Sequence, residues 1–368
     1  MIRRLYVHNF RCLENFELPI AGHSSALLIG RNGSGKTAVA FALKILQRIG
    51  DGTSHANDLV KPEDFTWGRD LPMRFELEVE LNGRVFAYSI VFKFRRAFKE
   101  IGVFEEDLAV DGERVYSRRM ANVQLTRASL ESAAEFPVGY HLVALPIIQE
   151  DSTQDPLFTL KKWLADMLIL RPIPSLILGD SEQETLRPKM EVSDFAAWFS
   201  GLLKESPAAF AQIFDYVKQI IPDLSNIINP LVAKDARSLV VQFSNGPEPV
   251  GLPFGELSDG EKCFMICAMV LAANKSRGPV LCFWDEPDSH LSLDEVGHFV
   301  SALRQEFQSR GQFIATSHNP EAIRSFSDEN TLLLYRKSHL EPTVVRPLSD
   351  IQISGDLVSA LVRGDVEP

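Results

Sequence analysis

The chain has 368 residues and a formal net charge of −11, and hydrophobic residues make up 45% of it. This length is enough for one large α/β domain with an insertion, or for two lobes that share a sheet. The negative charge excludes unspecific attraction to nucleic acid or to anionic membranes as a property of the whole molecule. Such binding would need a local basic face.

The sequence also bears on location. Residues 2–7 lack the apolar segment of a signal peptide, and nowhere is there an apolar run of about eighteen residues. The four cysteines form no C-x-x-C pair, and three of them lie in apolar runs where buried thiols are common: Cys12, Cys263, Cys267 and Cys282. We therefore expect a cytoplasmic protein with no disulfide framework and no membrane partner.

The first 150 residues alternate between strand and helix signals. Residues 2–8 predict a strand, a second strand ends at Ile20, and a helix runs from Lys36 to Ile49, where Gly50 and Gly52 stop it. From residue 73 to about 145 apolar and polar residues alternate, with tight turns at Asn82-Gly83 and Asp111-Gly112. This part predicts antiparallel strands.

The middle of the chain has helical spacing broken by prolines. It predicts helices over 157–170, over 193–204 with Ser193 as cap, and over 207–221 with Ser206 as cap. We interpret this part as a helical insertion. The predicted division is an ATPase lobe with an antiparallel β subdomain (1–150), the insertion (151–235) and the rest of the ATPase domain (236–368).

The last part alternates strands and helices, which is typical of a parallel sheet covered by helices. The expected elements are strands at 239–243, 280–284, 312–316 and 331–335, a helix at 292–308 with a capping box of Ser292 and Glu295, and a helix from Asn319.

The stretch between the second strand and the first helix matches G-x-x-x-x-G-K-[ST], a phosphate-binding loop. Its residues are Gly30, Arg31, Asn32, Gly33, Ser34, Gly35, Lys36 and Thr37. The glycines let consecutive N–H groups face one centre at a helix start. Lys36 is expected to reach the β- and γ-phosphates, and Thr37 to hold Mg²⁺.

Two later strands end in chemically active side chains. Asp285 and Glu286 follow the strand at 280–284, where ligands of parallel sheets bind. Asp285 is expected to complete the Mg²⁺ shell, and Glu286 to orient or deprotonate the attacking water. His318 follows the next strand and is expected to sense the γ-phosphate. The opposing interpretations are a capping role for the carboxylates and a structural role for the histidine.

A second anion site is predicted where an apolar helix opens with Ser258, Asp259, Gly260 and Glu261. Backbone N–H groups and the Ser258 hydroxyl can bind a phosphate there, but this site has no phosphate-loop lysine of its own. One chain thus carries two incomplete half-sites.

In order, these four segments resemble the Walker A, signature, Walker B and switch-histidine motifs of the ABC-type ATPases. The opening Val7 to Arg11 is most similar to the RecF/SMC/OLD branch, and it adds Arg11 to the nucleotide-binding residues. The resemblance implies an α/β P-loop NTPase fold of ABC type, with a mixed central sheet, an antiparallel β subdomain and a helical insertion. It also implies ATP and Mg²⁺ as cofactors, with Lys36, Glu286 and His318 in catalysis.

The sequence departs from the family at several points. Asp259 replaces the glycine of transporters, and Asp288 stands where the branch has glutamate. The glutamine that joins the two lobes and binds the metal is assigned to Gln149, with Gln154 as the alternative. The zinc hook and long arms of SMC-like proteins are missing, as is the nuclease domain of OLD proteins. We therefore expect the chain itself to cut nothing.

The resemblance implies a head-to-tail homodimer in which ATP lies between Walker A of one subunit and the signature of the other. It also suggests an effector encoded separately, as in bacterial defence modules of this branch. A DNA-binding face is assigned to Lys93, Arg95, Arg96 and Lys99, with Arg118 and Arg119 near them in sequence. A solvated strand face is the competing interpretation.

Two other functions are weighed. A nucleotide-binding subunit of a transporter is disfavoured by the opening residues and by Asp259. An ATP-binding scaffold with little turnover is disfavoured by Lys36, Asp285 and Glu286. A GTPase is excluded because the only N-K pair, Asn274-Lys275, lacks the aspartate of N-K-x-D.

Overall fold

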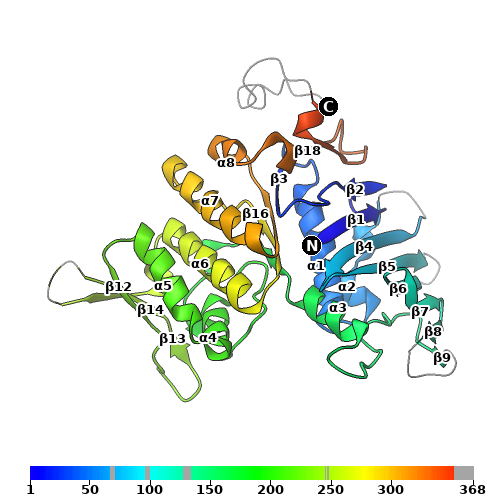
Figure 1. The fold of residues 1–368 in the computed structure, drawn as a ribbon, viewed down its shortest axis with the longest axis horizontal. Coiled ribbons are helices and arrows are strands. Elements are labelled where there is room, and N and C mark those ends of the chain that lie inside the picture. Colours follow the sequence, from blue (N-terminus) through cyan, green and yellow to red (C-terminus); the bar gives the residue numbers. More distant parts are fainter. Residues whose placement is uncertain (67–70, 96–99, 127–133, 245, 247, 352–368) are drawn as a thin grey trace. The chain divides into compact units, whose positions relative to one another are not determined.

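The computed structural model describes residues 1–66, 71–95, 100–126, 134–244, 246 and 248–351 (Figure 1). The chain divides into two compact units. Unit 1 contains Met1–His23, Leu28–Ala165 and the chain from Asp328 onward, and unit 2 contains Ser24–Leu27 and Asp166–Ser327.

Unit 1 is built on an antiparallel sheet of eight strands. In spatial order they are β2 (Phe16–Leu18), β1 (Ile2–His8), β4 (Met73–Leu81), β5 (Arg84–Arg95), β6 (Glu100–Val110), β7 (Glu113–Arg119), β8 (Asn122–Leu125) and β9 (Ala134–Pro137). The predicted turns are confirmed, because Asn82-Gly83 and Asp111-Gly112 all have the positive φ of tight hairpins.

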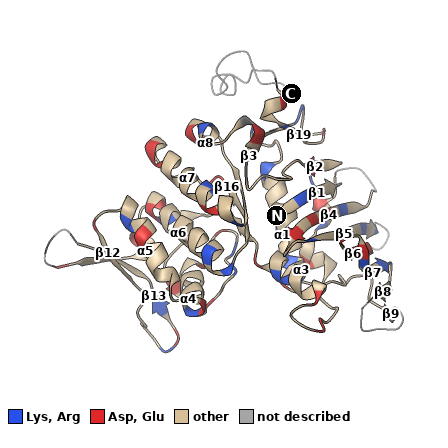
Figure 2. Ribbon diagram, viewed as in Figure 1, with Lys and Arg blue, Asp and Glu red and all other residues tan. Residues whose placement is uncertain are grey.

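The two faces of this sheet follow the alternation in its sequence. Residues at every second position of β4 are buried, and the Phe75 ring contacts those of Phe10 and Phe92, with centroids 5.3 and 6.2 Å away. The intervening positions carry charges of both signs, as Figure 2 shows for these strands. Arg4 pairs with Glu76 at 2.6 Å, and Arg74 with Glu105 at 3.3 Å. This face is therefore solvated and largely neutralised.

A buried carboxylate ties the chain after the sheet to its strands. Glu106 on β6 is fully buried and accepts hydrogen bonds from the Tyr88 and Tyr116 hydroxyls, at 3.1 and 2.8 Å. It also accepts from the backbone N–H groups of Ala144 and Leu145, at 2.7 and 2.9 Å. Glu106 thereby fixes the segment that leads to Gln149.

Glu106→Gln is expected to lower the free energy of unfolding by about 3 kcal/mol, because one amide oxygen replaces two accepting oxygens in a buried site. Burial raises the pKa of Glu106. The stability contributed by this group is therefore complete below its unfolded pKa and declines as pH rises through the folded value. Urea unfolding over a pH series measures both effects, and an unchanged pH slope in the variant would contradict the assignment.

The remaining elements of unit 1 include the phosphate-loop helix α1 (Lys36–Gly50), with α2 (Ala56–Leu59), η1 (Pro62–Asp64) and α3 (Pro156–Ala165). Helix α3 packs closely on α1, since a Cβ on Gly50 would lie 2.4 Å from the Cβ of Leu164. Near its end the chain adds the antiparallel pair β18 (Thr331–Tyr335) and β19 (Val344–Pro347), with η4 (Asp328–Asn330) and η5 (Leu348–Asp350).

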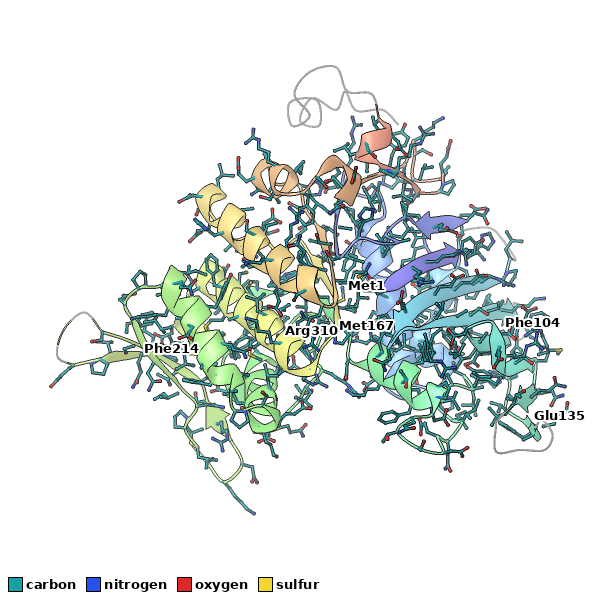
Figure 3. All side chains as sticks on the ribbon, viewed as in Figure 1. Met1, Phe104, Glu135, Met167, Phe214 and Arg310 are labelled. Carbon is teal, nitrogen blue, oxygen red and sulfur yellow. The ribbon has the colours of Figure 1, made fainter. Side chains whose placement is uncertain are left out.

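Unit 2 has a parallel sheet in the order β10 (Leu168–Leu170), β16 (Leu281–Asp285) and β17 (Gln312–Thr316). In the order of strands across this sheet, β3 (Ser25–Ile29) comes between β17 and β18. Its first three residues belong to unit 2 and its last two to unit 1. Every residue of β10, β16 and β17 is buried, as expected for a covered parallel sheet. Met167, labelled in Figure 3, is fully buried just before β10.

The main helices of unit 2 are α4 (Phe195–Glu205), α5 (Ala209–Ile220), α6 (Asp259–Arg277), α7 (Leu293–Ser309) and α8 (Pro320–Ser325). Phe299 of α7 joins the sheet to α6, with its ring 5.3 Å from Trp284 and 6.0 Å from Phe264. The smaller elements are η2 (Pro174–Leu176), η3 (Phe254–Glu256), the pair β11 (Asp180–Ser181) and β13 (Arg237–Ser238), and the sheet β12 (Leu224–Ile228), β14 (Val240–Phe243) and β15 (Val250–Pro253).

Three details of the predicted insertion are wrong. The helix expected to reach residue 170 ends at Ala165, because Leu168–Leu170 pairs with β16. The N-cap position of α4 is Asp194 rather than Ser193, that of α5 is Ala208 rather than Ser206, and neither side chain makes a capping hydrogen bond. The predicted domain boundaries at 150 and 235 stay a prediction. Helix α3 packs on α1 of unit 1, whereas α4 and α5 belong with α6 in unit 2.

Two expectations from composition can be compared with the structure. Cys263, Cys267 and Cys282 are buried, and burial raises the pKa of Cys263 and of Cys267 to about 12. Within the described residues, no helix combines the length and the apolar character needed to cross a bilayer.

Candidate functional site

The phosphate loop lies in unit 1 between the end of β3 and α1, and its glycines hold it in shape. Gly30, Gly33 and Gly35 have φ values of 147°, 80° and 109°. Gly30 also has no room for a side chain, because a Cβ would lie 2.2 Å from the carbonyl oxygen of Leu334. The backbone therefore has the conformation that a phosphate cradle requires.

Lys36 begins α1 and folds back over this loop. Its side chain is only 6% exposed, and Nζ donates to the carbonyl oxygens of Gly30 at 2.7 Å and Arg31 at 3.4 Å. Thr37 follows on the same helix turn and is half-buried. The loop thus holds a cation at the place where the motif predicts bound phosphate.

The hairpin between β18 and β19 supports the loop from the side. Thr343 is buried, and its hydroxyl donates to the carbonyl oxygen of Ser34 at 2.8 Å. Its N–H donates to the carbonyl oxygen of Cys12 at 2.9 Å. Arg336 donates to the carbonyl oxygen of Gly33 at 3.1 Å. These contacts fix the loop to a segment that is more than three hundred residues away in sequence.

Arg11 lies near the same helix. Its guanidinium donates to the Asp64 carboxylate at 2.9 Å and lies 4.0 Å from the centroid of the Phe41 ring on α1. Its backbone has a positive φ of 52°. Arg11 is thus held in one place, and its predicted nucleotide contact stays a prediction.

In unit 2, the carboxyl ends of β16 and β17 lie together because the two strands are parallel, with Asp285 opposite Thr316. Asp285 is 4% exposed and accepts a 2.6 Å hydrogen bond from the Thr316 hydroxyl. Its other oxygen lies 3.7 Å from the Arg171 guanidinium, at the end of β10. The predicted metal ligand is thus a buried carboxylate that is hydrogen-bonded to Thr316 and lies beside an arginine.

Glu286 has a φ of 53°, which is unfavourable for a residue with a side chain. The conformation is stabilised by a hydrogen bond from its N–H to the Thr316 hydroxyl oxygen, at 2.9 Å. His318 Nε2 lies 3.8 Å from a Glu286 carboxylate oxygen, and both side chains are half-exposed. Strained backbone of this kind concentrates at functional sites, and the structure brings the predicted base and the switch histidine together.

The predicted signature opens α6 in the same unit. Ser258 is the N-cap, and its hydroxyl oxygen accepts from the Glu261 N–H. The Ser258 N–H and hydroxyl both donate to the Glu261 carboxylate, at 2.8 and 2.7 Å, which completes a capping box. Gly260 lies against the next loop, where a Cβ would be 3.1 Å from the carbonyl oxygen of His290.

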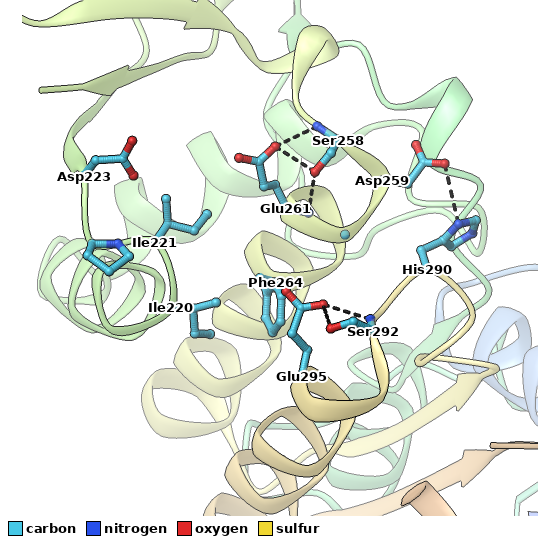
Figure 4. Close-up of a pocket in the computed structure, with 12 residues that line it drawn as sticks. Ile220, Ile221, Asp223, Ser258, Asp259, Glu261, Phe264, His290, Ser292 and Glu295 are labelled. Atoms are coloured by element: carbon cyan, nitrogen blue, oxygen red, sulfur yellow. Dashed lines mark hydrogen bonds and ion pairs between the residues drawn. The ribbon is translucent and has the colours of Figure 1, made fainter. Parts of the chain in front are cut away.

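A pocket of about 770 Å³ lies at this helix start (Figure 4). Its lining comes from the starts of α6 and α7 and the end of α5, and Asp259 pairs with His290 across it at 3.5 Å. The lining contains four acidic residues and no lysine or arginine: Asp223, Asp259, Glu261 and Glu295. Lys262 points elsewhere and donates to the carbonyl oxygens of Gly255 and Pro174. The pocket lining therefore has no lysine or arginine to neutralise a triphosphate, and its Ser258 and Ser292 hydroxyls donate to the Glu261 and Glu295 carboxylates.

The remaining predicted residues have varied positions. Gln149 and Gln154 are both exposed in unit 1, and the assignment of Gln149 as the lobe-joining glutamine stays a prediction. Lys93 is exposed, and Arg95 lies over the Tyr140 ring at 4.2 Å. Arg96 and Lys99 lie outside the described residues.

The two arginines assigned to the vicinity of this face do not form it. Arg118 is fully buried, donates to the carbonyl oxygens of Met120 and Gly139, and lies 3.7 Å from Glu106. The alternation of β7 turns it inward. Arg119 is exposed but paired with Asp107 at 2.8 Å.

Comparison with known proteins decides the family. The model of the RecF/RecN/SMC N terminal domain matches residues 1–340. The chain belongs to the RecF/RecN/SMC family. This assigns it to the ABC-type ATPases of the RecF/SMC/OLD branch and favours that branch over a transporter subunit.

Two curated relatives match parts of this RecF/RecN/SMC protein. The chromosome partition protein Smc of Chlorobaculum tepidum is 26% identical over 148 residues, which is 40% of this chain and 12% of that protein. The OLD nuclease of Thermus scotoductus is 37% identical over 65 residues, which is 18% of this chain and 12% of that protein. The chain thus aligns with about an eighth of the length of either relative.

Solved structures bear out the predicted fold. A crystal structure of SmcHead bound to the C-winged helix domain of ScpA has a TM-score of 0.55 at 14% identity, covering 95% of this chain and 98% of that one. The Smc head of Pyrococcus furiosus, with an extended coiled coil and bound to the C-terminal domain of ScpA, has a TM-score of 0.55 at 12% identity, covering 95% and 97%. The α/β fold of ABC type is confirmed.

The residues of this RecF/RecN/SMC protein fit the nucleotide and metal that the family implies. Gly30 and Gly35 provide a cradle that side chains would fill, and Lys36 provides the charge. The described residues contain no group of three or more His, Cys, Asp or Glu side chains that could hold a metal. Mg²⁺ in nucleotide sites takes one or two protein ligands besides phosphates and water, and Thr37 and Asp285 stay predictions for those ligands.

The sequence analysis missed several residues around these motifs. Thr316 bridges Asp285 and Glu286, and its position as the last residue of a predicted strand was an available signal. Arg171 was missed because its strand was interpreted as helix. Thr343 and Arg336 follow the last predicted strand, and nothing local marks them as supports of the phosphate loop.

Proposed function

We propose that this protein binds ATP with Mg²⁺ and hydrolyses it as a nucleotide-driven dimer switch. The observation that carries the proposal is the arrangement at the ends of β16 and β17. There Thr316 holds Asp285 and a strained Glu286, and His318 lies 3.8 Å from the Glu286 carboxylate. A buried metal ligand, a water-activating carboxylate and a histidine donor are the groups that phosphoryl transfer to water requires.

Each residue has one role in this proposal. The loop Gly30 to Thr37 binds the phosphates, Lys36 neutralises them, and Thr37 and Asp285 bind Mg²⁺, which when bound offsets the charge on the phosphate oxygens. Glu286 orients and deprotonates the attacking water, and His318 donates to the γ-phosphate. Gln149 and Arg11 stay predictions for the metal and the nucleotide.

Two copies are needed because the signature pocket has no cation of its own. Ser258 and the N–H groups at the start of α6 can donate to a phosphate, but the four acidic residues beside them oppose a free triphosphate. A phosphate already neutralised by Lys36 and Mg²⁺ of a second copy removes this difficulty. We infer a two-fold homodimer in which each signature completes the other copy's nucleotide site. ATP then favours the closed dimer, and hydrolysis releases it.

Dilution of the protein tests this proposal. Specific ATPase activity is expected to fall by at least about tenfold once the concentration drops well below the dimerisation constant, because a lone copy lacks a signature at its nucleotide. The measurement is phosphate release over a dilution series, with the mass of the ATP-bound form measured in parallel. Constant specific activity for a species with the mass of one chain would contradict the dimer.

The biological task stays a prediction. An effector encoded separately and a role in antiviral defence or DNA-related work are consistent with the OLD and Smc likeness. DNA contact would involve Lys93 and Arg95. The alternative function is an ATP-binding scaffold with little turnover. The same measurement of phosphate release distinguishes it from the proposed ATPase.

A further inference from the structure

Asp288 is a buried acid that the proposed mechanism does not use. It lies two residues after Glu286 and is 6% exposed. One carboxylate oxygen accepts a 2.7 Å hydrogen bond from the Ser317 hydroxyl. The other oxygen is buried and has no hydrogen-bond partner among the described residues. Such a group needs a reason other than stability, because a half-satisfied buried carboxyl costs free energy.

The charge on Asp288 makes this cost larger. Burial raises the pKa of the Asp288 carboxyl, and the neighbouring Glu286 carboxylate adds to the rise, while the Ser317 hydrogen bond opposes it. A hydrophobic residue of similar size would avoid these costs. The presence of an acid at position 288 is therefore best explained by the residue to which it is hydrogen-bonded, Ser317.

Asp288 holds the residue that precedes the switch histidine. Ser317 is 1% exposed, and its hydroxyl oxygen also accepts from the Asn319 N–H at 2.8 Å. Since Thr316 bonds to Asp285 and Glu286, two consecutive hydroxyl side chains bind the segment 285–288 on both sides of Glu286. The loop that carries Glu286 and the loop that carries His318 are thus joined twice.

We propose that Asp288 is a positioning residue for ATP hydrolysis: through Ser317 it fixes His318 beside Glu286. The inference rests on the proposed ATPase function. The 3.8 Å separation of His318 Nε2 from the Glu286 carboxylate depends on where each loop leaves its strand. The Thr316 bonds fix the start of the Glu286 loop, and the Asp288–Ser317 bond fixes its further end to the residue before His318. Without the Asp288–Ser317 bond, the His318 imidazole can still donate a hydrogen bond, but it is no longer held beside Glu286.

Asp288→Ala and Ser317→Ala test this without changing a group that touches ATP, because each removes one partner of the Asp288–Ser317 hydrogen bond. Both are expected to lower kcat by about tenfold and to leave KM for ATP within about twofold, because misplacement of a transition-state donor affects the chemical step rather than binding. Ser325→Ala is the matched control. It removes a half-buried hydroxyl on α8 that donates to the carbonyl oxygen of Glu321 at 2.8 Å, and it should change kcat by less than about twofold.

A double-mutant cycle separates positioning from general support. If Asp288 acts through His318, Asp288→Ala causes no further loss of kcat when it is added to His318→Ala. An equal loss in both backgrounds, or a parallel rise in KM, would overturn the proposal. A wrong ATPase proposal would give a different result. Glu286→Gln would then hydrolyse ATP at the parent's rate, whether or not Asp288 is substituted. Ser317→Ala keeps the test open if Asp288→Ala does not fold.

Discussion

Glu286→Gln is expected to retain less than about one hundredth of the parent's ATP turnover and to accumulate as an ATP-bound dimer. Glutamine keeps the size of the side chain and the Thr316 bond to the backbone N–H, but it cannot take a proton from water. Because ATP is bound and not consumed, the contacts that favour the closed form persist. Turnover is measured by phosphate release, and the trapped state by mass in the presence of ATP and Mg²⁺.

A second glutamate gives the control for this variant. Glu321 is partly exposed and pairs with Arg324 on α8, three residues after His318 in sequence, so Glu321→Gln should keep the parent's rate. If Glu286→Gln turned over ATP as fast as the parent, the base would have been misassigned. If Glu286→Gln turned over ATP slowly but stayed monomeric with ATP bound, the assignment of Glu286 as the base would stand and the dimer switch would be refuted.

Ser258→Arg is expected to abolish turnover and to leave ATP binding to the single chain intact. The substitution replaces the short N-cap with a long side chain at the pocket of Figure 4, so a phosphate from another copy could no longer reach the N–H groups of α6. Loss of the cap itself costs only about 1 kcal/mol. The measurements are ATP affinity, turnover and thermal stability of the purified variant.

Mixing two inactive variants gives the strictest test of the shared site. Lys36→Ala is expected to lose ATP binding and to keep its signature, whereas Ser258→Arg is expected to do the reverse. In a random equal mixture, half of the dimers contain one copy of each variant. In each of these, one of the two nucleotide sites combines an intact phosphate loop with an intact signature. About one quarter of the parent's activity should therefore return. Full activity of Ser258→Arg by itself would remove the signature from the mechanism.

Much of the site could be predicted because its chemistry lies in short consecutive stretches. Gly30 to Thr37 define a strand-to-helix turn by their own backbone preferences, and the loop has the expected positive φ values. The predicted capping box of Ser292 and Glu295 is local as well, and it is present. The hairpins of the antiparallel sheet follow from Asn-Gly and Asp-Gly turns between alternating strands.

The missed features depend on partners distant in sequence. Leu168–Leu170 is an apolar run that suits a helix or a strand, and pairing with β16 more than a hundred residues later makes it a strand. This pairing places Arg171 beside Asp285. Arg118 was interpreted as a surface charge because sequence does not show which face of β7 packs inward.

The sequence by itself determined which motifs this protein carries, in which order, and the local shapes of its phosphate loop, helix caps and hairpins, because these depend on neighbouring residues. Only the tertiary structure decided which side chains support them: Thr316 between Asp285 and Glu286, Asp288 on Ser317, and Thr343 under the phosphate loop. These bonds join segments 29 to 309 residues apart. Sheet pairing and burial bring such segments together, and no local pattern encodes either.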